Sequence, residues 1–110
     1  MDLLGRILLA ALFAAGAVQK ATAPEAAQAL LAGLGLPVWL VWPALALNAG
    51  LAVGLIWPPT VRRAALIAAA YCGATSVFHF QPEDGWQMSI FVKNWAIAGG
   101  LLTLAAARKV

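Results

Sequence analysis

Long apolar runs with few charges constrain this chain more than any other feature. Four of them extend from about residue 3 to 20, 38 to 57, 63 to 80 and 89 to 107. Helices formed by such runs are apolar on every side, which is typical of membrane spans rather than of surface helices. A helix of about 20 residues crosses a hydrocarbon core of roughly 30 Å. We therefore predict an all-α integral membrane protein with four transmembrane helices packed as a four-helix bundle.

The composition supports this class of protein and excludes others. Of the 110 residues, 64% are hydrophobic and only 10% are charged, whereas a soluble domain carries about 25% charged residues. The length predicts one membrane domain over residues 1–110. The net charge of +3 is too small and too scattered to indicate binding to nucleic acid. The lipid bilayer is the first partner that the sequence predicts.

Cysteine and histidine each occur once, and this limits the chemistry. Cys72 is the only cysteine, which excludes an intramolecular disulfide, a CxxC redox pair and a thiolate metal cluster. His79 is the only histidine, which excludes a haem held by two axial histidines of this chain. With so few ligands of either kind, no metal site is predicted.

The first apolar run has a second interpretation, as a cleaved signal peptide. Ala21–Ala23 fits an A-x-A cleavage site that follows an apolar core. Two features argue against this interpretation, because Asp2 offsets the charge of Arg6 before the core and Lys20 lies close to the cleavage point. We therefore predict a retained transmembrane helix and keep the signal peptide as the alternative.

The segment after the first run predicts a short helix at the membrane interface. Thr22 is suited to cap a helix that has Glu25 in its first turn. Gly33 and Gly35 are suited to end it, because glycine commonly follows the last helical turn. An ordinary ordered loop is the alternative for this segment.

A second turn, Gln81–Gln87, joins the third and fourth runs. Ser89 is predicted to cap the fourth helix, which places Lys93 in its first turn. The helix dipole disfavours a cation there by about 0.3–1 kcal/mol. Lys93 is therefore expected to face an anionic or accepting partner. The candidates are Glu83 or Asp84 from the turn, a lipid headgroup or a quinone carbonyl.

The distribution of cations predicts the orientation in the membrane. Four spans put both termini on the same side as the Arg62–Arg63 loop, and this side carries five of the seven lysines and arginines. The positive-inside rule therefore places both termini in the cytoplasm. The hairpin that contains His79 then faces outward.

Polar residues are expected to gather near the outer face. Lys20, His79, Lys93 and Asn94 would converge at one depth, with Asn48 lining the floor about 15 Å along the second helix. Each also has a purely structural interpretation. The lysines would extend to the interface, His79 would cap its own helix, and Asn48 would hydrogen-bond a neighbouring helix.

Glycines predict close approach between helices. Gly50 and Gly54 form a small-xxx-small pair in the second run. Gly99 and Gly100 are assigned the same packing role in the fourth run. Such faces suit a homo-oligomer or a larger partner protein.

Several short segments stand in a characteristic order and spacing: Gly5–Ala10, Phe13–Gly16, Lys20, Gly33–Pro37, the Gly50/Gly54 helix with the Pro and Arg-Arg residues after it, His79 and Phe91–Leu102. In these segments the chain resembles the DoxX family. They extend over essentially the whole chain, and they favour a retained first helix.

This resemblance implies a four-helix protein of the bacterial cytoplasmic (inner) membrane. Some members of the family are linked to membrane redox complexes, including thiosulfate:quinone oxidoreductase and thiol-stress systems. The positions that match are Lys20, His79, Lys93 and Asn94. Members often carry a glutamate in the second helix near the position of Asn48, so a function that needs a buried carboxylate, such as proton relay, is not expected here.

Three hypotheses follow for the function. The first is a redox-associated subunit that binds a quinone, to which His79, Lys93 and Asn94 would donate hydrogen bonds. At most it would be one subunit of a membrane oxidoreductase. The second is a small transporter or channel for an anionic or neutral solute, since the spans lack an embedded acid. The third is a structural partner of a larger membrane complex.

Overall fold

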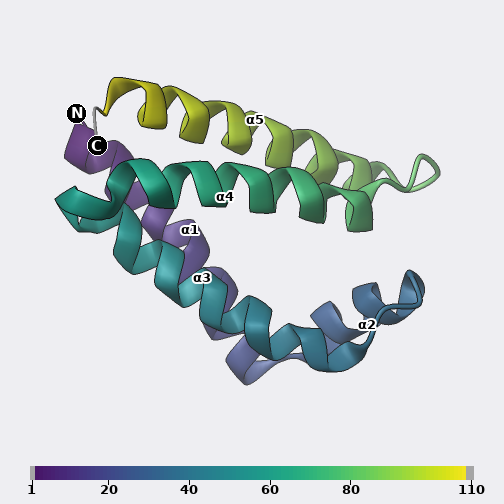
Figure 1. Cartoon of the computed structure of the whole chain (residues 1–110). Coiled ribbons are helices and arrows are strands. Elements are labelled where there is room, and N and C mark those ends of the chain that lie inside the picture. Colours follow the sequence, from purple (N-terminus) through teal and green to yellow (C-terminus); the bar gives the residue numbers. More distant parts are fainter. Residues whose placement is uncertain (1, 109–110) are drawn as a thin grey trace. The chain divides into compact units, whose positions relative to one another are not determined.

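The structure, a computed structural model, describes residues 2–108, and the elements in this range are all helical (Figure 1). The all-α prediction is confirmed for these residues. The five α-helices and three 3₁₀ turns are α1 (Asp2–Thr22), α2 (Glu25–Gly33), η1 (Val38–Leu40), α3 (Val41–Ile56), η2 (Pro58–Thr60), α4 (Val61–Thr75), η3 (Ser76–His79) and α5 (Gly85–Ala107).

The chain divides into two compact units, Met1–Pro58 and Pro59–Val110. In the first unit α1 packs along α3, and in the second α4 packs along α5 (Figure 1). Each unit is therefore a pair of long helices, and each is described by itself below. A single domain over residues 1–110 stays a prediction.

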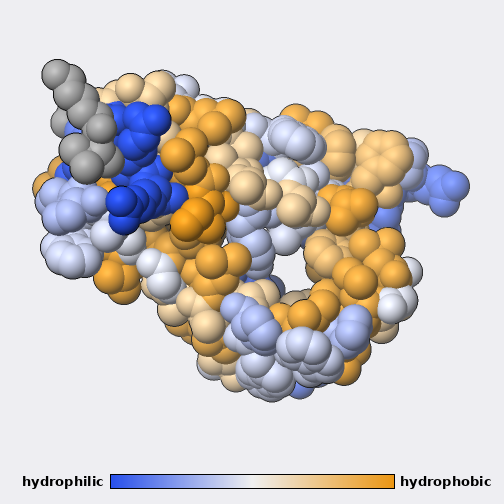
Figure 2. Space-filling view, viewed as in Figure 1, coloured by the Kyte–Doolittle hydropathy of each residue, from blue (hydrophilic) through white to orange (hydrophobic). Residues whose placement is uncertain are grey.

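Three helical segments of the described residues have the length and composition of membrane spans. They are Asp2–Thr22, Val38–Ile56 and Gly85–Ala107, and they are candidates for three of the four predicted spans. Apolar side chains cover much of the surface seen in Figure 2. Large ones such as Leu8, Val53 and Val92 are exposed, as expected for side chains that face lipid.

The third predicted span, residues 63–80, differs from the prediction. The α-helix there, α4, has 15 residues, and the chain continues as the 3₁₀ turn η3. An α-helix of that length rises only about 23 Å, less than the roughly 30 Å of a hydrocarbon core. Arg62 and Arg63 in its first turn also make it less apolar. The four-helix membrane bundle and the cytoplasmic termini stay predictions.

The predicted short helix between the first two spans is present as α2. Its cap differs, however, because the Thr22 hydroxyl donates to the Val18 oxygen inside α1, 2.8 Å away. Pro24 occupies the cap position of α2 and makes no side-chain bond there. The chain reverses at Gly35, whose φ of +72° falls in the region that glycine enters readily. The interfacial position of α2 stays a prediction.

The start of α5 lies four residues before the predicted one. The Asp84 carboxylate, not the Ser89 hydroxyl, caps the helix by accepting from the backbone nitrogens of Trp86 and Gln87 at 3.0 and 3.3 Å. Ser89 instead donates to the Gly85 oxygen within the helix. The prediction of Ser89 as the cap is therefore wrong.

This earlier start changes the position of Lys93 in the helix. Lys93 lies eight residues after Gly85, in the third turn of α5 rather than the first. The dipole acts within about the first turn of a helix. The helix dipole therefore does not disfavour Lys93, and it gives no reason to expect an anionic partner for this residue.

Candidate functional site

Asn48 of α3 is the buried polar centre of the first unit. Its side chain is only 5% exposed. Its Nδ2 atom donates to the Phe13 oxygen of α1 over a long distance of 3.4 Å. Its Oδ1 atom is also buried and has no hydrogen-bond partner in residues 2–108. An unsatisfied buried acceptor costs about 1–3 kcal/mol, so this oxygen is suited to a donor from outside the helix pair.

Gly16 of α1 makes room for the Asn48 carboxamide. A Cβ atom built on Gly16 would overlap the Nδ2 atom of Asn48. The same Cβ position lies 3.8 Å from the Nζ atom of Lys20. The Lys20 side chain therefore runs back along α1 toward Asn48, in the direction that helical side chains tilt. We call Gly16, Lys20 and Asn48 the amide cluster.

The position of the Lys20 ammonium argues against the interpretation that this side chain only extends to the interface. Lys20 is in the last turn of α1 and is half-buried. A lysine that only extends to the nearest water would point past the helix end. Here the ammonium lies beside Gly16, one helical turn farther from that end, and the Asn48 amide contacts the same glycine.

Arg6 is a buried cation whose role sequence reasoning missed. It is 8% exposed and pairs with Asp2 through Nε at 2.9 Å. Its Nη1 atom donates to the backbone oxygens of Leu55 and Ile56 at 3.3 and 2.9 Å. The guanidinium thereby satisfies open carbonyls at the C-terminus of α3. The sequence feature that could have indicated this role is the position of an arginine one turn inside an apolar run.

His79 is the centre of the polar group in the second unit. Its Nδ1 atom lies 2.6 Å from the Oε1 atom of Gln87 in α5. An amide oxygen only accepts, so Nδ1–H donates and Nε2 is left for another partner. The predicted capping of its own helix by the His79 ring is not the bond seen here. Gln87 was missed because it lay in the predicted turn.

An aromatic row lies next to His79 in the sequence and along α5. The Phe80 and Phe91 ring centres are 5.3 Å apart, and those of Phe91 and Trp95 are 6.5 Å apart in an edge-to-face arrangement. Trp95 lies against Gly73 of α4, where a Cβ atom would be 3.3 Å from the indole. These rings form an apolar wall of the kind that a planar ligand packs against.

The other predicted site residues of α5 are less enclosed. Lys93 is exposed and lines shallow surface grooves with Ser89, whereas Asn94 is half-buried. Consecutive helical positions point about 100° apart, so Lys93 and Asn94 face different directions. Asp84, one predicted partner of Lys93, caps the helix instead.

The structure thus brings Lys20 and Asn48 together in one unit and places His79 with Gln87 in the other. Convergence of Lys20 with His79 and Lys93 would join the two units and stays a prediction. The predicted packing glycines stay predictions as well. A Cβ atom on Gly50, Gly99 or Gly100 would meet no described atom within 4 Å, so those faces are open.

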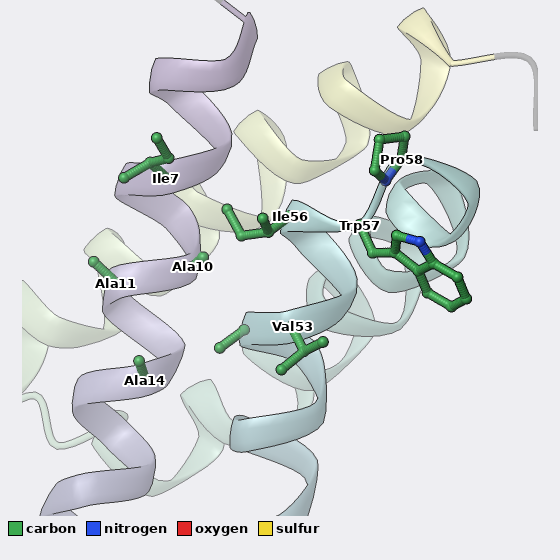
Figure 3. A pocket seen from close by; sticks show the side chains of 9 residues that line it. Ile7, Ala10, Ala11, Ala14, Val53, Ile56, Trp57 and Pro58 are labelled. Atoms are coloured by element: carbon green, nitrogen blue, oxygen red, sulfur yellow. The ribbon is translucent and has the colours of Figure 1, made fainter.

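An apolar groove runs along the α1–α3 pair, with a volume of about 720 Å³ (Figure 3). In Figure 3 the labelled side chains of α1 lie on one side of it, and those of α3 and of the two residues after α3 lie on the other. The lining residues are Ile7, Ala10, Ala11, Ala14, Ala52, Val53, Ile56, Trp57 and Pro58. None of them is ionisable, so the groove is suited to hydrocarbon.

Comparison with known proteins gives one match. The DoxX family model matches residues 1–81. That range includes Lys20, Asn48 and His79 and ends before Lys93 and Asn94, so it is shorter than the resemblance drawn from the sequence. No curated protein and no solved structure matches the chain.

Proposed function

The chain belongs to the DoxX family of membrane proteins, and on that premise we propose that it is a small redox-associated subunit that binds a membrane quinone. In this proposal it lies in the bacterial inner membrane and serves a larger oxidoreductase. The observation that carries the proposal is the His79–Gln87 hydrogen bond beside the aromatic row of Phe80, Phe91 and Trp95.

The bond to Gln87 fixes the plane of the His79 ring and leaves Nε2 for a ligand oxygen. The neutral ring accepts at Nε2 from a hydroquinone hydroxyl, and the protonated ring donates from Nε2 to a quinone carbonyl. The same Nε2 atom therefore serves both redox forms of the ligand.

The rest of the proposal concerns the contacts of the quinone ring and of the second quinone oxygen. The aromatic row would pack against a quinone ring, since offset and edge-to-face contacts between rings are favourable. Asn94, half-buried on α5, supplies a further donor from the side of the helix that carries Phe91. Lys93 lies about 200° around the helix from Phe91 and is left out of this proposal.

The test is the amount of quinone that copurifies with the protein in mild detergent, measured by mass spectrometry of an organic extract. We expect a near-stoichiometric quinone in the wild type and a loss of at least fivefold in His79→Ala. Gln87→Leu should give an intermediate loss, because the imidazole is kept but no longer oriented. Glu83→Gln, an exposed change in the same hairpin, is the matched control and should retain the quinone.

A wild type without quinone, or equal amounts in the wild type and His79→Ala, would contradict the proposal. The second candidate function is a structural partner of a larger complex. One observation favours it, the open space over Gly99 and Gly100 on α5, which another helix can approach closely. Copurification of an oxidoreductase in the absence of quinone would support that alternative.

A further inference from the structure

The exposed face of α4 changes from charged to apolar within one helical turn. Arg62 and Arg63 are exposed in the first turn. Leu66 and Ile67, one turn later, are exposed at 41% and 51%. Residues four apart lie on the same side of a helix, so each arginine has an apolar neighbour farther along that side. A phospholipid changes in the same way, from a phosphate to an acyl chain.

The neighbouring helix places this end of α4 at the membrane surface. The two helices pack along each other, and the start of α4 lies beside the end of α5 (Figure 1). α5 has the length and composition of a membrane span, and it ends at Ala107. The Nη1 atom of Arg62 donates to the Ala105 and Arg108 oxygens at that end. Arg62 is therefore at the depth of lipid headgroups, whichever face of the membrane this end occupies.

The bonds to α5 hold the Arg62 guanidinium in place and leave part of it unused. Arginine has N–H donors on Nε, Nη1 and Nη2, and here Nη1 serves both backbone oxygens. Nε and Nη2 have no partner among residues 2–108, and together they form an edge that can donate to two oxygens of one phosphate. A side chain that is held before binding loses less entropy when its ligand arrives.

The local charge favours an anionic partner. Arg63 is exposed and makes no hydrogen bond or ion pair within the described residues. The acids in the described part of the second unit are Glu83 and Asp84, which precede α5 at its other end. Each arginine near the membrane surface strengthens the binding of an anionic lipid about fivefold. These arginines therefore favour a headgroup with a net negative charge over a zwitterionic one.

We propose that the exposed face of α4 binds an anionic phospholipid. Nε and Nη2 of Arg62 donate to two oxygens of the lipid phosphate, and Arg63 adds positive charge beside the headgroup. An acyl chain lies along Leu66 and Ile67. The occupant is a lipid rather than an acidic protein, because exposed apolar side chains follow the charged turn directly. The inference goes beyond the proposed function and does not depend on it, since His79 lies after the other end of α4.

The test measures dissociation constants of phosphatidylglycerol and of phosphatidylcholine with the same acyl chains, by native mass spectrometry of the detergent-purified protein. We expect the wild type to bind phosphatidylglycerol about fivefold more tightly, or more. Arg62→Gln should weaken that binding about twentyfold or more, because the charge and the paired hydrogen bonds are lost together. Arg63→Gln removes the same charge and is the matched control, with an expected loss of about fivefold.

Arg62→Lys is a second variant, which keeps the charge but lacks the planar edge. It should bind phosphatidylglycerol more weakly than the wild type and more tightly than Arg62→Gln, and wild-type affinity would overturn the role of that edge.

Three other outcomes would overturn the inference. Equal affinity of the wild type for the two lipids would remove the anionic preference. Equal losses in Arg62→Gln and Arg63→Gln would mean that only the overall charge acts and that Arg62 is not the phosphate ligand. Displacement of the lipid by excess inorganic phosphate or by a polyglutamate peptide would mean that this face takes a soluble anion or an acidic protein. Each of these results leaves the quinone measurement on His79→Ala unaffected.

Discussion

The Nη1 atom of Arg6 lies 2.9 Å from the backbone oxygen of Ile56, fifty residues farther along the chain. This bond ties the beginning of α1 to the end of α3. Arg6 is 8% exposed, and the same atom also reaches the Leu55 oxygen. The guanidinium is thus a structural part of the first helix pair, a role separate from the effect on orientation that the sequence predicted.

Replacement of Arg6 is expected to destabilise the first unit. Arg6→Ala removes a charged donor from buried carbonyls, and such bonds contribute about 1.5–3 kcal/mol each. Arg6→Lys keeps the charge but lacks the planar fork that serves Asp2 and the carbonyls together, so its loss should be intermediate. The measurement is thermal unfolding in detergent followed by far-UV circular dichroism. Equal midpoints for Arg6→Lys and the wild type would show that charge alone matters.

A methyl group on Gly16 is expected to force the α1–α3 pair apart. The Cβ atom of Gly16→Ala would overlap the Asn48 amide, and overpacking of this kind costs about 1–3 kcal/mol. Gly5→Ala on the same helix has open space and should be neutral or slightly stabilising, because alanine favours helix. The readout is again the unfolding midpoint.

A double-mutant cycle isolates the contact between the two residues. In an Asn48→Ala background the carboxamide is gone, so Gly16→Ala should cost close to nothing there. The same cost for Gly16→Ala in both backgrounds would mean that the methyl group clashes with something other than Asn48.

Loss of the Asp84 carboxylate is expected to fray the start of α5. Asp84→Ala removes the acceptor of two backbone donors, and loss of such a cap costs about 1 kcal/mol. Ser89→Ala, the cap that the sequence alone suggested, should change stability by less than about 0.5 kcal/mol. Hydrogen exchange at the amides of Trp86 and Gln87 checks this directly, and faster exchange in Ser89→Ala than in Asp84→Ala would reverse the assignment.

Arg62 is expected to stabilise the second unit less than Arg6 does the first. Its Nη1 atom donates to the oxygens of Ala105 and Arg108 at 3.4 and 2.9 Å, but the side chain is exposed. Arg62→Ala should therefore lower stability by only about 0.5–1 kcal/mol. Arg63→Ala, next to it and also exposed, removes the same charge and serves as the control. Identical unfolding midpoints for the two variants would show that the carbonyl bonds contribute nothing.

Hydropathy predicted the three long apolar helices, because a run of apolar residue types is enough to form such a helix in a membrane, and the sequence shows such runs directly. It overestimated the third run, since Arg62 and Arg63 open that helix and the α-helix ends at Thr75. The start of α5 was misplaced for a different reason. Asp84 and Ser89 both have side chains that cap helices, and only the extended backbone of Asp84, with φ −117° and ψ 103°, shows which one does.

The sequence indicated several residues of the candidate site, but it did not indicate which residues those would contact. Lys20, Asn48 and His79 stood out as polar groups within apolar runs. Their partners Gly16 and Gln87 did not, because a glycine in an alanine-rich helix and a glutamine near a turn have many ordinary explanations. The Gly16–Asn48 contact depends on the register of two helices that are 32 residues apart in the sequence, and no local pattern encodes that register.

The bond between Arg6 and the end of α3 also has a consequence for the order of events during synthesis. The acceptor oxygens at Leu55 and Ile56 do not exist until about fifty more residues have been added to the chain. Until then the guanidinium has a partner only four residues away, the carboxylate of Asp2. Asp2 is thus the first counter-ion available to Arg6 as the chain grows, and the helix pair keeps this ion pair beside the later bonds.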